Sequence, residues 1–164
     1  MAELPKKVEE ALENYYRLFS LLIAGMYFAV TREFGEEKGN ELLVKGFRET
    51  GRLWGEANAE YSGQAGAGDA KSFAEAYLGN IRYYGFRADM EEGATSKRAV
   101  VRIFRCPIND TLRPLSISAK VCDRSEHELD VATAKFVNPR LKLTVPRSLA
   151  RGDPYCEYIY ELED

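Results

Sequence analysis

Three cysteines and the single histidine are the side chains best suited to nucleophilic or metal chemistry. All four lie in the second half of the chain: Cys106, Cys122, His127 and Cys156. A cysteine thiolate is a nucleophile, and a helix N-terminus or a neighbouring cation stabilises it. Cys106 is the best placed, because it ends a predicted strand, precedes Pro107 and follows Arg105. Thiols are also common in protein cores, so a structural role is the alternative for each cysteine.

Cys122 is followed directly by a carboxylate, Asp123. A carboxylate close to a thiol raises the pKa of the thiol and weakens it as a nucleophile. The same carboxylate could instead act as a base that orients a water molecule. His127 lies in a charged stretch, residues 124–128, at a predicted helix start, which predicts an exposed histidine with acidic neighbours.

Zinc binding is the other chemistry that three cysteines and a histidine suggest. Cys122 and His127 have a usable local spacing, with Cys106 and Cys156 as distant partners, but zinc sites usually contain a close pair of cysteines. The sequence has no such pair. We therefore expect no metal and no cofactor. An odd number of widely spaced cysteines also argues against a disulfide framework and favours a cytoplasmic protein.

Composition excludes several classes of function. The 164 residues suit one domain, 1–164, with a substantial core. A net charge of −3 with scattered basic residues argues against nucleic-acid binding. The uncharged run at residues 18–30 is too short to cross a membrane, which takes about 20 apolar residues. We expect a small-molecule ligand or substrate as the partner, and neither nucleic acid nor membrane.

Two long helices are predicted ahead of these residues. Apolar residues recur every three or four positions from Lys6 to Phe34, and further apolar residues make this helix hydrophobic almost all round. A second helix with a narrower apolar stripe covers about 43–61. Because the first helix is more apolar than one buried face requires, we predict a homodimer with this helix at or near the contact.

Gly46, Gly51 and Gly55 in the second helix have two interpretations. Each costs up to about 1 kcal/mol relative to alanine in a helix interior. Close packing against another helix is the favoured reason, and room for a ligand beside the backbone is the alternative. The glycine-rich connection at 62–68 lacks the Gly-Lys-Ser/Thr ending of a phosphate loop, which argues against nucleotide binding.

The remaining patterns predict an antiparallel sheet with inserted helices. Alternating apolar residues indicate strands, and Asn138-Pro139 ends the last helix because a residue before proline is held out of the helical region. The predicted elements are a short helix capped by Asp69 or Ser72, strands over 84–90 and 99–103, helical segments over 112–122 and 130–136, and strands over 141–145 and 156–160. The chain is therefore predicted to be α+β, with long N-terminal helices packed on an antiparallel sheet of about four strands.

The order of short motifs resembles the L-2-amino-thiazoline-4-carboxylate hydrolase family. These motifs are Cys106-Pro107, Cys122-Asp123, Phe-Val-Asn-Pro at 136–139, Thr144, and Gly-Asp-Pro-Tyr-Cys-Glu-Tyr at 152–158. The two long N-terminal helices extend the resemblance over most of the chain. The C-terminal motif also resembles the 4-vinyl reductase domain, a small-molecule-binding α+β module. Some sensors of that kind hold zinc through Glu-x-x-Cys-x7-Cys, and Val145 and Ser148 stand at its first two places here, which implies that this metal site is absent.

The resemblance implies a reaction and a set of roles. The family opens a 2-aminothiazoline ring by adding water at the amidine carbon, which gives a carbamoyl-cysteine. The implied catalytic residues are Cys106 or Cys122 as nucleophile and Asp123 as base. The implied substrate-binding residues are Asn138, Asp153 and Cys156, with Arg113, Arg140 or Arg147 as a clamp for the carboxylate.

Two functions remain open at this point. One is a small-molecule hydrolase acting on a C–N bond of a cyclic amidine or amide. The other is a non-catalytic domain that holds a small apolar ligand between the sheet and the helices. The shared order of motifs implies, for either function, that Cys106, Cys122 and Cys156 converge on one site.

Overall fold

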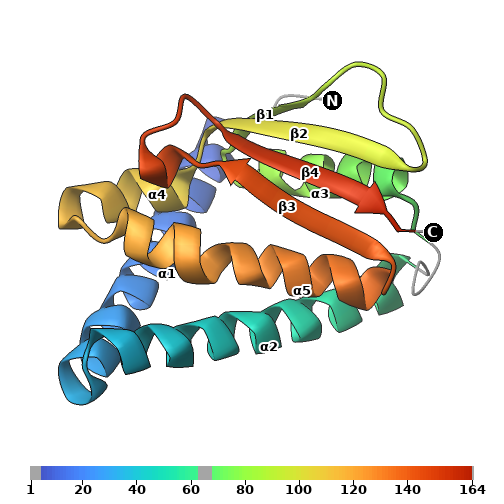
Figure 1. The fold of residues 1–164 in the computed structure, drawn as a ribbon. Coiled ribbons are helices and arrows are strands. Elements are labelled where there is room, and N and C mark those ends of the chain that lie inside the picture. The colour runs from blue at the N-terminus through green and yellow to red at the C-terminus, as the bar shows by residue number, and fades with distance from the viewer. Residues whose placement is uncertain (1–4, 63–67, 164) are drawn as a thin grey trace.

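The protein is an α+β domain in which helices cover one face of a four-stranded sheet (Figure 1). The computed structural model describes residues 5–62 and 68–163, so most of the predicted glycine-rich connection lies outside the described residues. The α-helices are α1 (Lys6–Phe34), α2 (Glu36–Ser62), α3 (Ala70–Tyr83), α4 (Pro107–Leu112) and α5 (His127–Val137). The shorter helical segments are η1 (Arg113–Leu115), η2 (Ala119–Glu126) and η3 (Leu149–Arg151). The strands are β1 (Arg87–Met90), β2 (Arg98–Arg105), β3 (Leu141–Arg147) and β4 (Cys156–Leu162).

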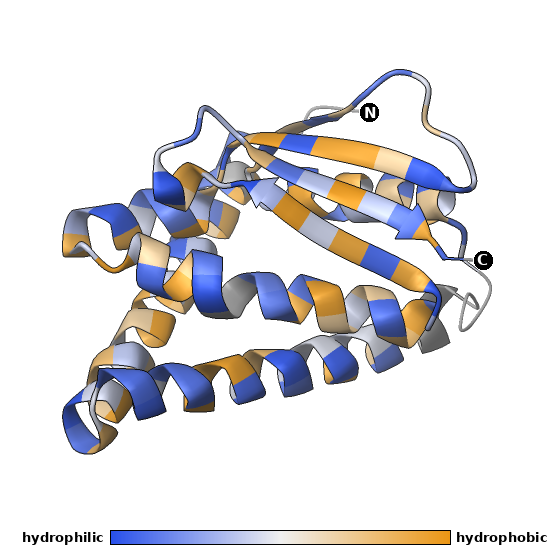
Figure 2. Ribbon diagram, in the orientation of Figure 1, coloured by the Kyte–Doolittle hydropathy of each residue, from blue (hydrophilic) through white to orange (hydrophobic). Residues whose placement is uncertain are grey.

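The sheet has the order β1-β2-β4-β3, and every neighbouring pair is antiparallel. The predicted α+β class, the first hairpin and the two C-terminal strands are therefore confirmed. In the central pair, Cys156 lies opposite Ile103 and Tyr158 lies opposite Val101. Cys156, Tyr158 and Tyr160 alternate along β4 and are all buried. This burial pattern places Cys156 and Tyr158 on the face that the helices cover. Figure 2 shows hydrophilic and hydrophobic residues interspersed along the strands and helices.

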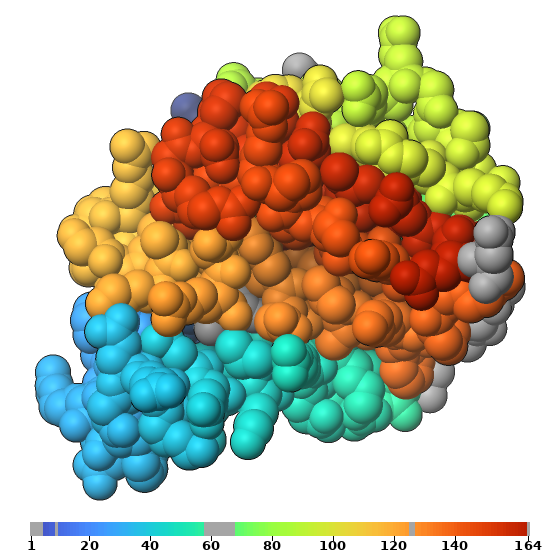
Figure 3. Space-filling model, in the orientation of Figure 1, coloured from blue at the N-terminus to red at the C-terminus, as the bar shows by residue number. Residues whose placement is uncertain are grey.

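Helix α5 lies between the sheet and α2 (Figures 1 and 3). Glycines allow α2 to approach it closely. A Cβ atom on Gly55 would lie 2.9 Å from Cβ of Phe136, and one on Gly51 would collide with the Leu129 carbonyl. Close packing therefore explains Gly51 and Gly55, whereas a Cβ atom on Gly46 would meet no atom within 4 Å.

Helix α1 has the predicted bounds and buries only one of its faces. Ile23, Ala24 and Tyr27 belong to the core. Five large apolar residues on another face are each more than two-fifths exposed: Val8 41%, Tyr15 61%, Leu18 68%, Leu22 60% and Met26 52%. In the described part of the chain, no helix combines the length and the apolar character that a bilayer crossing requires.

The connection from β3 to β4 is shaped by the Gly-Asp motif. Gly152 has φ +93°, a left-handed conformation that favours glycine. The Asp153 carboxylate accepts a hydrogen bond of 2.7 Å from the backbone N–H of Ser148. The backbone N–H of Leu149 in turn donates to Sγ of Cys156 at 3.3 Å. The motif thus folds η3 back against the start of β4 and fixes the position of Cys156.

Candidate functional site

A cavity of about 260 Å³ lies between the sheet and the helices, and all three cysteines line it. Cys106 comes from the junction of β2 and α4, Cys122 from η2, and Cys156 from the first position of β4. Each of the three residues is buried. The structure therefore brings together thiols that are up to 50 positions apart in the sequence.

Aromatic rings form much of the cavity wall. Nine contribute: Tyr15, Tyr16, Phe19, Trp54, Phe73, Tyr77, Tyr84, Phe86 and Tyr158. The rings of Tyr77 and Tyr158 stack with their centroids 5.6 Å apart, and the ring of Tyr16 meets that of Phe86 edge-on at 5.7 Å. Such rings offer flat apolar surfaces and negative π faces to a ligand.

Cys106 caps the first turn of α4. Its Sγ accepts a hydrogen bond of 3.5 Å from the backbone N–H of Asn109, and Pro107 occupies the first helical position, where proline is favoured. A backbone N–H directed at sulfur favours the thiolate over the thiol. The local sequence thus places a thiol at a strand-to-helix junction, as predicted.

Cys122 lies on η2, a π-helical segment, which is a rare form that often marks a functional site. Its Sγ is 4.0 Å from Oγ of Ser118. The hydroxyl of Ser118, the residue just before η2, donates a hydrogen bond to the side-chain carbonyl of Asn109 in α4. Ser118 and Asn109 are both buried polar residues, so this contact ties the helical segments that carry Cys122 and Cys106 to each other.

Asp130 places a carboxylate in the same cavity. Its Oδ2 accepts hydrogen bonds from the hydroxyls of Tyr158, at 2.9 Å, and Tyr77, at 3.5 Å. Burial raises the pKa of Asp130 from 3.8 to about 7, while the two tyrosine hydrogen bonds act in the opposite direction. A carboxyl group with this pKa both accepts and donates protons near neutral pH, which is the property of a general acid and base.

His127 is buried in the cavity wall, so the predicted surface histidine was wrong. Its ring meets that of Tyr158 edge-on at 5.6 Å. Burial lowers the pKa of His127 to about 4; Asp123 and Glu128 oppose this shift, and Arg151 adds to it. The imidazole is therefore neutral at neutral pH. The π-helical turns of η2 change the helical period just before His127, and a period of 3.6 residues could not reveal which face the histidine takes.

A comparison with known protein families matches residues 15–160 to the family described as L-2-amino-thiazoline-4-carboxylic acid hydrolase. The chain belongs to this family. The match begins at Tyr15 in the cavity wall and ends at the buried Tyr160 of β4, so it includes the whole site. The search of curated proteins gave no match to the chain.

Among solved structures, this member of the hydrolase family is similar to a protein from Naegleria fowleri. That structure is the crystal structure of a trafficking protein particle complex subunit 3 covalently bound to palmitic acid. The TM-score is 0.64 with 14% sequence identity, and the similarity covers 93% of this chain and 97% of the other. At this level of identity the likeness concerns the fold alone.

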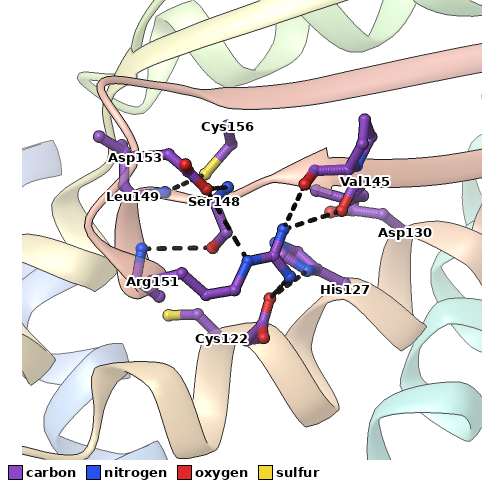
Figure 4. A network of polar contacts seen from close by, with 12 residues as sticks. Cys122, His127, Asp130, Val145, Ser148, Leu149, Arg151, Asp153 and Cys156 are labelled. Atoms are coloured by element: carbon purple, nitrogen blue, oxygen red, sulfur yellow. Dashed lines mark hydrogen bonds and ion pairs between the residues drawn. The ribbon is translucent and has the colours of Figure 1, made fainter.

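Asp123 and Asp153 are not among the residues that line the cavity. Figure 4 shows Asp153 beside Ser148 and Cys156. Asp123 accepts a hydrogen bond of 2.6 Å from Arg151, and its carboxylate is 3.9 Å from Nδ1 of His127. Arg151 also donates to the Val145 carbonyl at 3.2 Å. These contacts link η2, the end of β3 and the turn that carries Asp153.

Asn138 and Arg140 stand at the turn between α5 and β3. The Asn138 amide donates to the carbonyl of Gly68 at 2.8 Å and accepts a bond of 3.0 Å from the backbone N–H of Arg140. The Arg140 side chain is exposed, as is that of Arg113, and neither residue lines the cavity. Arg147 lies over the ring of Tyr155, 5.4 Å from its centroid, also outside the lining.

Asp130 and the tyrosines that donate hydrogen bonds to it were not among the site residues predicted from the sequence. Tyr158 stands inside the quoted Gly-Asp-Pro-Tyr-Cys-Glu-Tyr motif, and Asp130 appeared only as the first residue of a helical pattern. One signal was available. Asp130 follows His127 by three positions and is flanked by Leu129 and Val131, so one helical face carries a histidine and an acid next to apolar residues.

The described residues contain no group of three or more His, Cys, Asp or Glu side chains placed to hold a metal ion. Instead of the Glu and the first Cys of the vinyl-reductase zinc pattern, this chain has Val145 and Ser148. The Ser148 hydroxyl accepts a hydrogen bond of 3.2 Å from the backbone N–H of Ala150. Ser148 therefore caps η3.

Proposed function

We propose that the chain is a hydrolase that opens a small cyclic amidine or amide with water, and that the cavity is its active site. The observation that carries this proposal is the meeting of three thiols, Asp130 and a neutral His127 in one cavity of a member of this hydrolase family. The two ionisable groups have pKa values moved in opposite directions by their surroundings, a pattern that is typical of active sites.

Asp130 supplies the proton transfers in this proposal. The ionised carboxylate takes a proton from a water molecule while the water oxygen bonds to the amidine carbon and the π electron pair of the C=N bond moves to its nitrogen. The tetrahedral adduct then collapses: its hydroxyl gives up the second proton to that nitrogen or to solvent and becomes a C=O group, the ring bond from the same carbon breaks, the electron pair of that bond goes to the departing sulfur or nitrogen, and Asp130 returns its proton to that atom. One water is consumed and the carboxylate is restored. The hydroxyls of Tyr158 and Tyr77 hold the carboxylate in place.

A thiolate could take the place of water in the first step. Cys106 or Cys122 would add to the same carbon, and water would then release the covalent intermediate. The hydrogen bond from the Asn109 backbone to the sulfur supports Cys106 in this role. Intact mass spectrometry during turnover separates the two routes, because only the second gives a protein adduct. Serine variants at each position identify the residue that carries it.

The test of this proposal is ring opening by the purified protein. A panel of 2-aminothiazolines and cyclic amides is incubated with enzyme, and the ring-opened product is followed by mass spectrometry. Asp130→Asn should lower the rate by about 10²- to 10⁴-fold, the usual contribution of a general acid and base. Glu92→Gln, an exposed carboxylate in the β1–β2 turn, is the control and should keep the wild-type rate. Unchanged turnover in Asp130→Asn would refute the role of this residue, and no ring opening of any compound would refute the activity.

A second candidate function is covalent binding of an acyl chain. Two observations favour it: the solved structure of similar fold carries covalently bound palmitic acid, and this chain places three cysteines in a cavity with apolar walls. A thiolate would attack the carbonyl of an activated acyl donor, form a thioester and release the donor group. Protein purified from cells would then show the mass of an acyl adduct that hydroxylamine removes. A sensor of the 4-vinyl reductase kind is less favoured, because the matched family is one of hydrolases.

We also propose that the chain forms a homodimer through the exposed face of α1. Seven exposed residues on this face are small or apolar and repeat at alternating steps of three and four, as in a helix-pairing seam: Val8, Ala11, Tyr15, Leu18, Leu22, Gly25 and Ala29. The stripe is roughly 33 Å long at 1.5 Å per residue. It contains no charged residue.

A second copy fits this stripe in the antiparallel direction. A two-fold axis then sets Tyr15 against Gly25 of the other copy and Leu18 against Leu22, so a large ring meets a position where a Cβ would have open space. The same arrangement brings Lys6 and Lys7 close to Glu33 at the end of the partner's α1 and to the acidic start of its α2, at residues 36–37, whereas a parallel pair would set like charges together.

Light scattering at micromolar concentration tests the assembly. A mass of twice 18.6 kDa is expected for wild type. Leu22→Glu should give the monomer mass, and Leu53→Glu, which changes an exposed leucine of α2, should leave the dimer intact. A monomeric wild type, or a Leu22→Glu protein that stays dimeric, would contradict this interface.

A further inference from the structure

We propose that the cavity binds its substrate as a planar cation, a protonated cyclic amidine without a carboxylate group, with Asp130 as counter-ion and aromatic rings around it. This inference rests on the proposed function, because it names the class of substrate for the same site. It also separates this chain from the substrate after which the family is named, which carries a carboxylate.

The aromatic wall is the first reason. A cation over the face of a tryptophan or tyrosine is attracted by the ring, and the attraction grows where water is excluded. The stacked pair of Tyr77 and Tyr158 stands next to Asp130, since both hydroxyls donate to its carboxylate. Trp54 and Tyr16 contribute further rings to the same cavity. A flat cation of ring size therefore finds π faces beside a carboxylate.

The carboxylate itself is the second reason. An amidinium group presents two parallel N–H donors, and a carboxylate accepts such a pair with both of its oxygens. An ionised carboxylate offers about four lone-pair positions, so accepting the two tyrosine hydroxyls at Oδ2 leaves acceptor capacity for a ligand. Asp130 would then both hold the amidine and lie next to the carbon that water attacks.

The charge balance of the cavity is the third reason. Among the described residues, no lysine or arginine lines the cavity, and the residues outside the described part contain neither type in the sequence. The ionisable lining consists of tyrosines, the three cysteines, a neutral His127 and Asp130. A carboxylate on the ligand would therefore lie near Asp130 without a cation to balance it, which is unfavourable in a partly desolvated site.

The only tryptophan of the chain, Trp54, lines the cavity and reports binding by its fluorescence. Three ligands built on one five-membered ring are titrated at pH 8: 2-amino-2-thiazoline, which is the cyclic amidine; 2-thiazolidinone, which is its neutral counterpart; and 2-amino-2-thiazoline-4-carboxylate, which adds a carboxylate to the amidine. The amidine should bind at least tenfold more tightly than either of the others. Equal or tighter binding of the neutral ring or of the carboxylate, or no response to any of the three, would overturn the inference.

Asp130→Asn provides the matched variant. It should bind the amidine no more tightly than the neutral ring, while its affinity for the neutral ring stays within about threefold of wild type. A variant that keeps the tenfold preference would also overturn the inference. The wild-type comparison of three ligands stands without the variant, so a folding defect in Asp130→Asn does not remove the test.

Binding is measured here without turnover, which separates this inference from the proposed hydrolase. Selective binding of the amidine without ring opening would support the inference and refute the hydrolase. Ring opening of neutral amides without a preference for the amidine would do the reverse.

Discussion

Asp130→Asn should make the protein more stable and less active at alkaline pH. The pKa of Asp130 is raised by burial from 3.8 to about 7, so the ionised carboxylate is held in the fold at a cost. Asparagine has nearly the same shape, keeps an oxygen that accepts the tyrosine hydroxyls, and has no charge to desolvate. The variant therefore removes the charge and preserves the packing.

The size and the pH range of the effect follow from the pKa. A pKa difference of one corresponds to about 1.36 kcal/mol, so the rise of the Asp130 pKa from 3.8 to about 7 corresponds to at most about 4 kcal/mol. Because the pKa is higher in the folded chain than in the unfolded chain, folding takes up a proton. The contribution of protonated Asp130 is complete below pH 3.8 and is lost as the pH rises through about 7. Wild type should therefore lose stability between pH 5 and pH 8.5 relative to the variant.

Urea denaturation of both proteins at pH 5 and pH 8.5 measures this difference. The variant should gain on wild type by between 1 and about 4 kcal/mol at pH 8.5, and the gain should be roughly two-thirds smaller at pH 5, where the folded carboxyl group is still mostly protonated. Its rate of ring opening should fall at both pH values. A difference in stability that does not depend on pH would refute the argument that Asp130 carries a desolvated charge.

Three further outcomes follow from other contacts. In wild type, kcat/KM should rise with pH through about 7 as Asp130 ionises. Tyr158→Phe removes a hydrogen bond that lowers the pKa of Asp130, so this rise should move to higher pH in a pH–rate profile. A profile that does not move would contradict this expectation. Gly51→Ala should destabilise the fold by about 1–3 kcal/mol because the added Cβ atom collides with α5. Gly46→Ala on the same helix should stabilise the fold by about 0.4–1 kcal/mol, because its Cβ atom meets open space. If the urea midpoints of the two variants shift in the same direction, the close packing of α2 on α5 is contradicted. Purified protein should contain less than one zinc per chain by elemental analysis, because Val145 and Ser148 replace two ligands of the vinyl-reductase pattern. The melting temperature should stay the same in chelator. One zinc per chain would contradict this expectation.

The sequence predicted the architecture because its signals are local and periodic. The apolar repeat predicted the bounds of α1, and alternation along residues 156–160 predicted the strand β4. Gly51 and Gly55 of α2 were correctly interpreted as a packing device, since the clash that alanine would cause there depends only on two helices meeting, whereas the same interpretation fails for Gly46.

The chemistry of the site was harder to predict because it depends on contacts between distant segments. The pKa of Asp130 is raised by burial and lowered in part by hydrogen bonds from Tyr77 and Tyr158, which are 53 and 28 positions away in the sequence. His127 is turned inward after a π-helical segment that no simple repeat reveals. Asp123, chosen for its place beside Cys122, instead forms an ion pair with Arg151, 28 positions away.

The most direct test of the account is a crystal structure of the protein with 2-amino-2-thiazoline. We expect the ring between Trp54 and the stacked pair of Tyr77 and Tyr158, with its two nitrogens facing the Asp130 carboxylate and its amidine carbon open to the cysteines of the cavity. A ligand bound elsewhere while the cavity stays empty, or a ring in the cavity with its nitrogens turned away from Asp130, would contradict the assignment of this cavity as the active site.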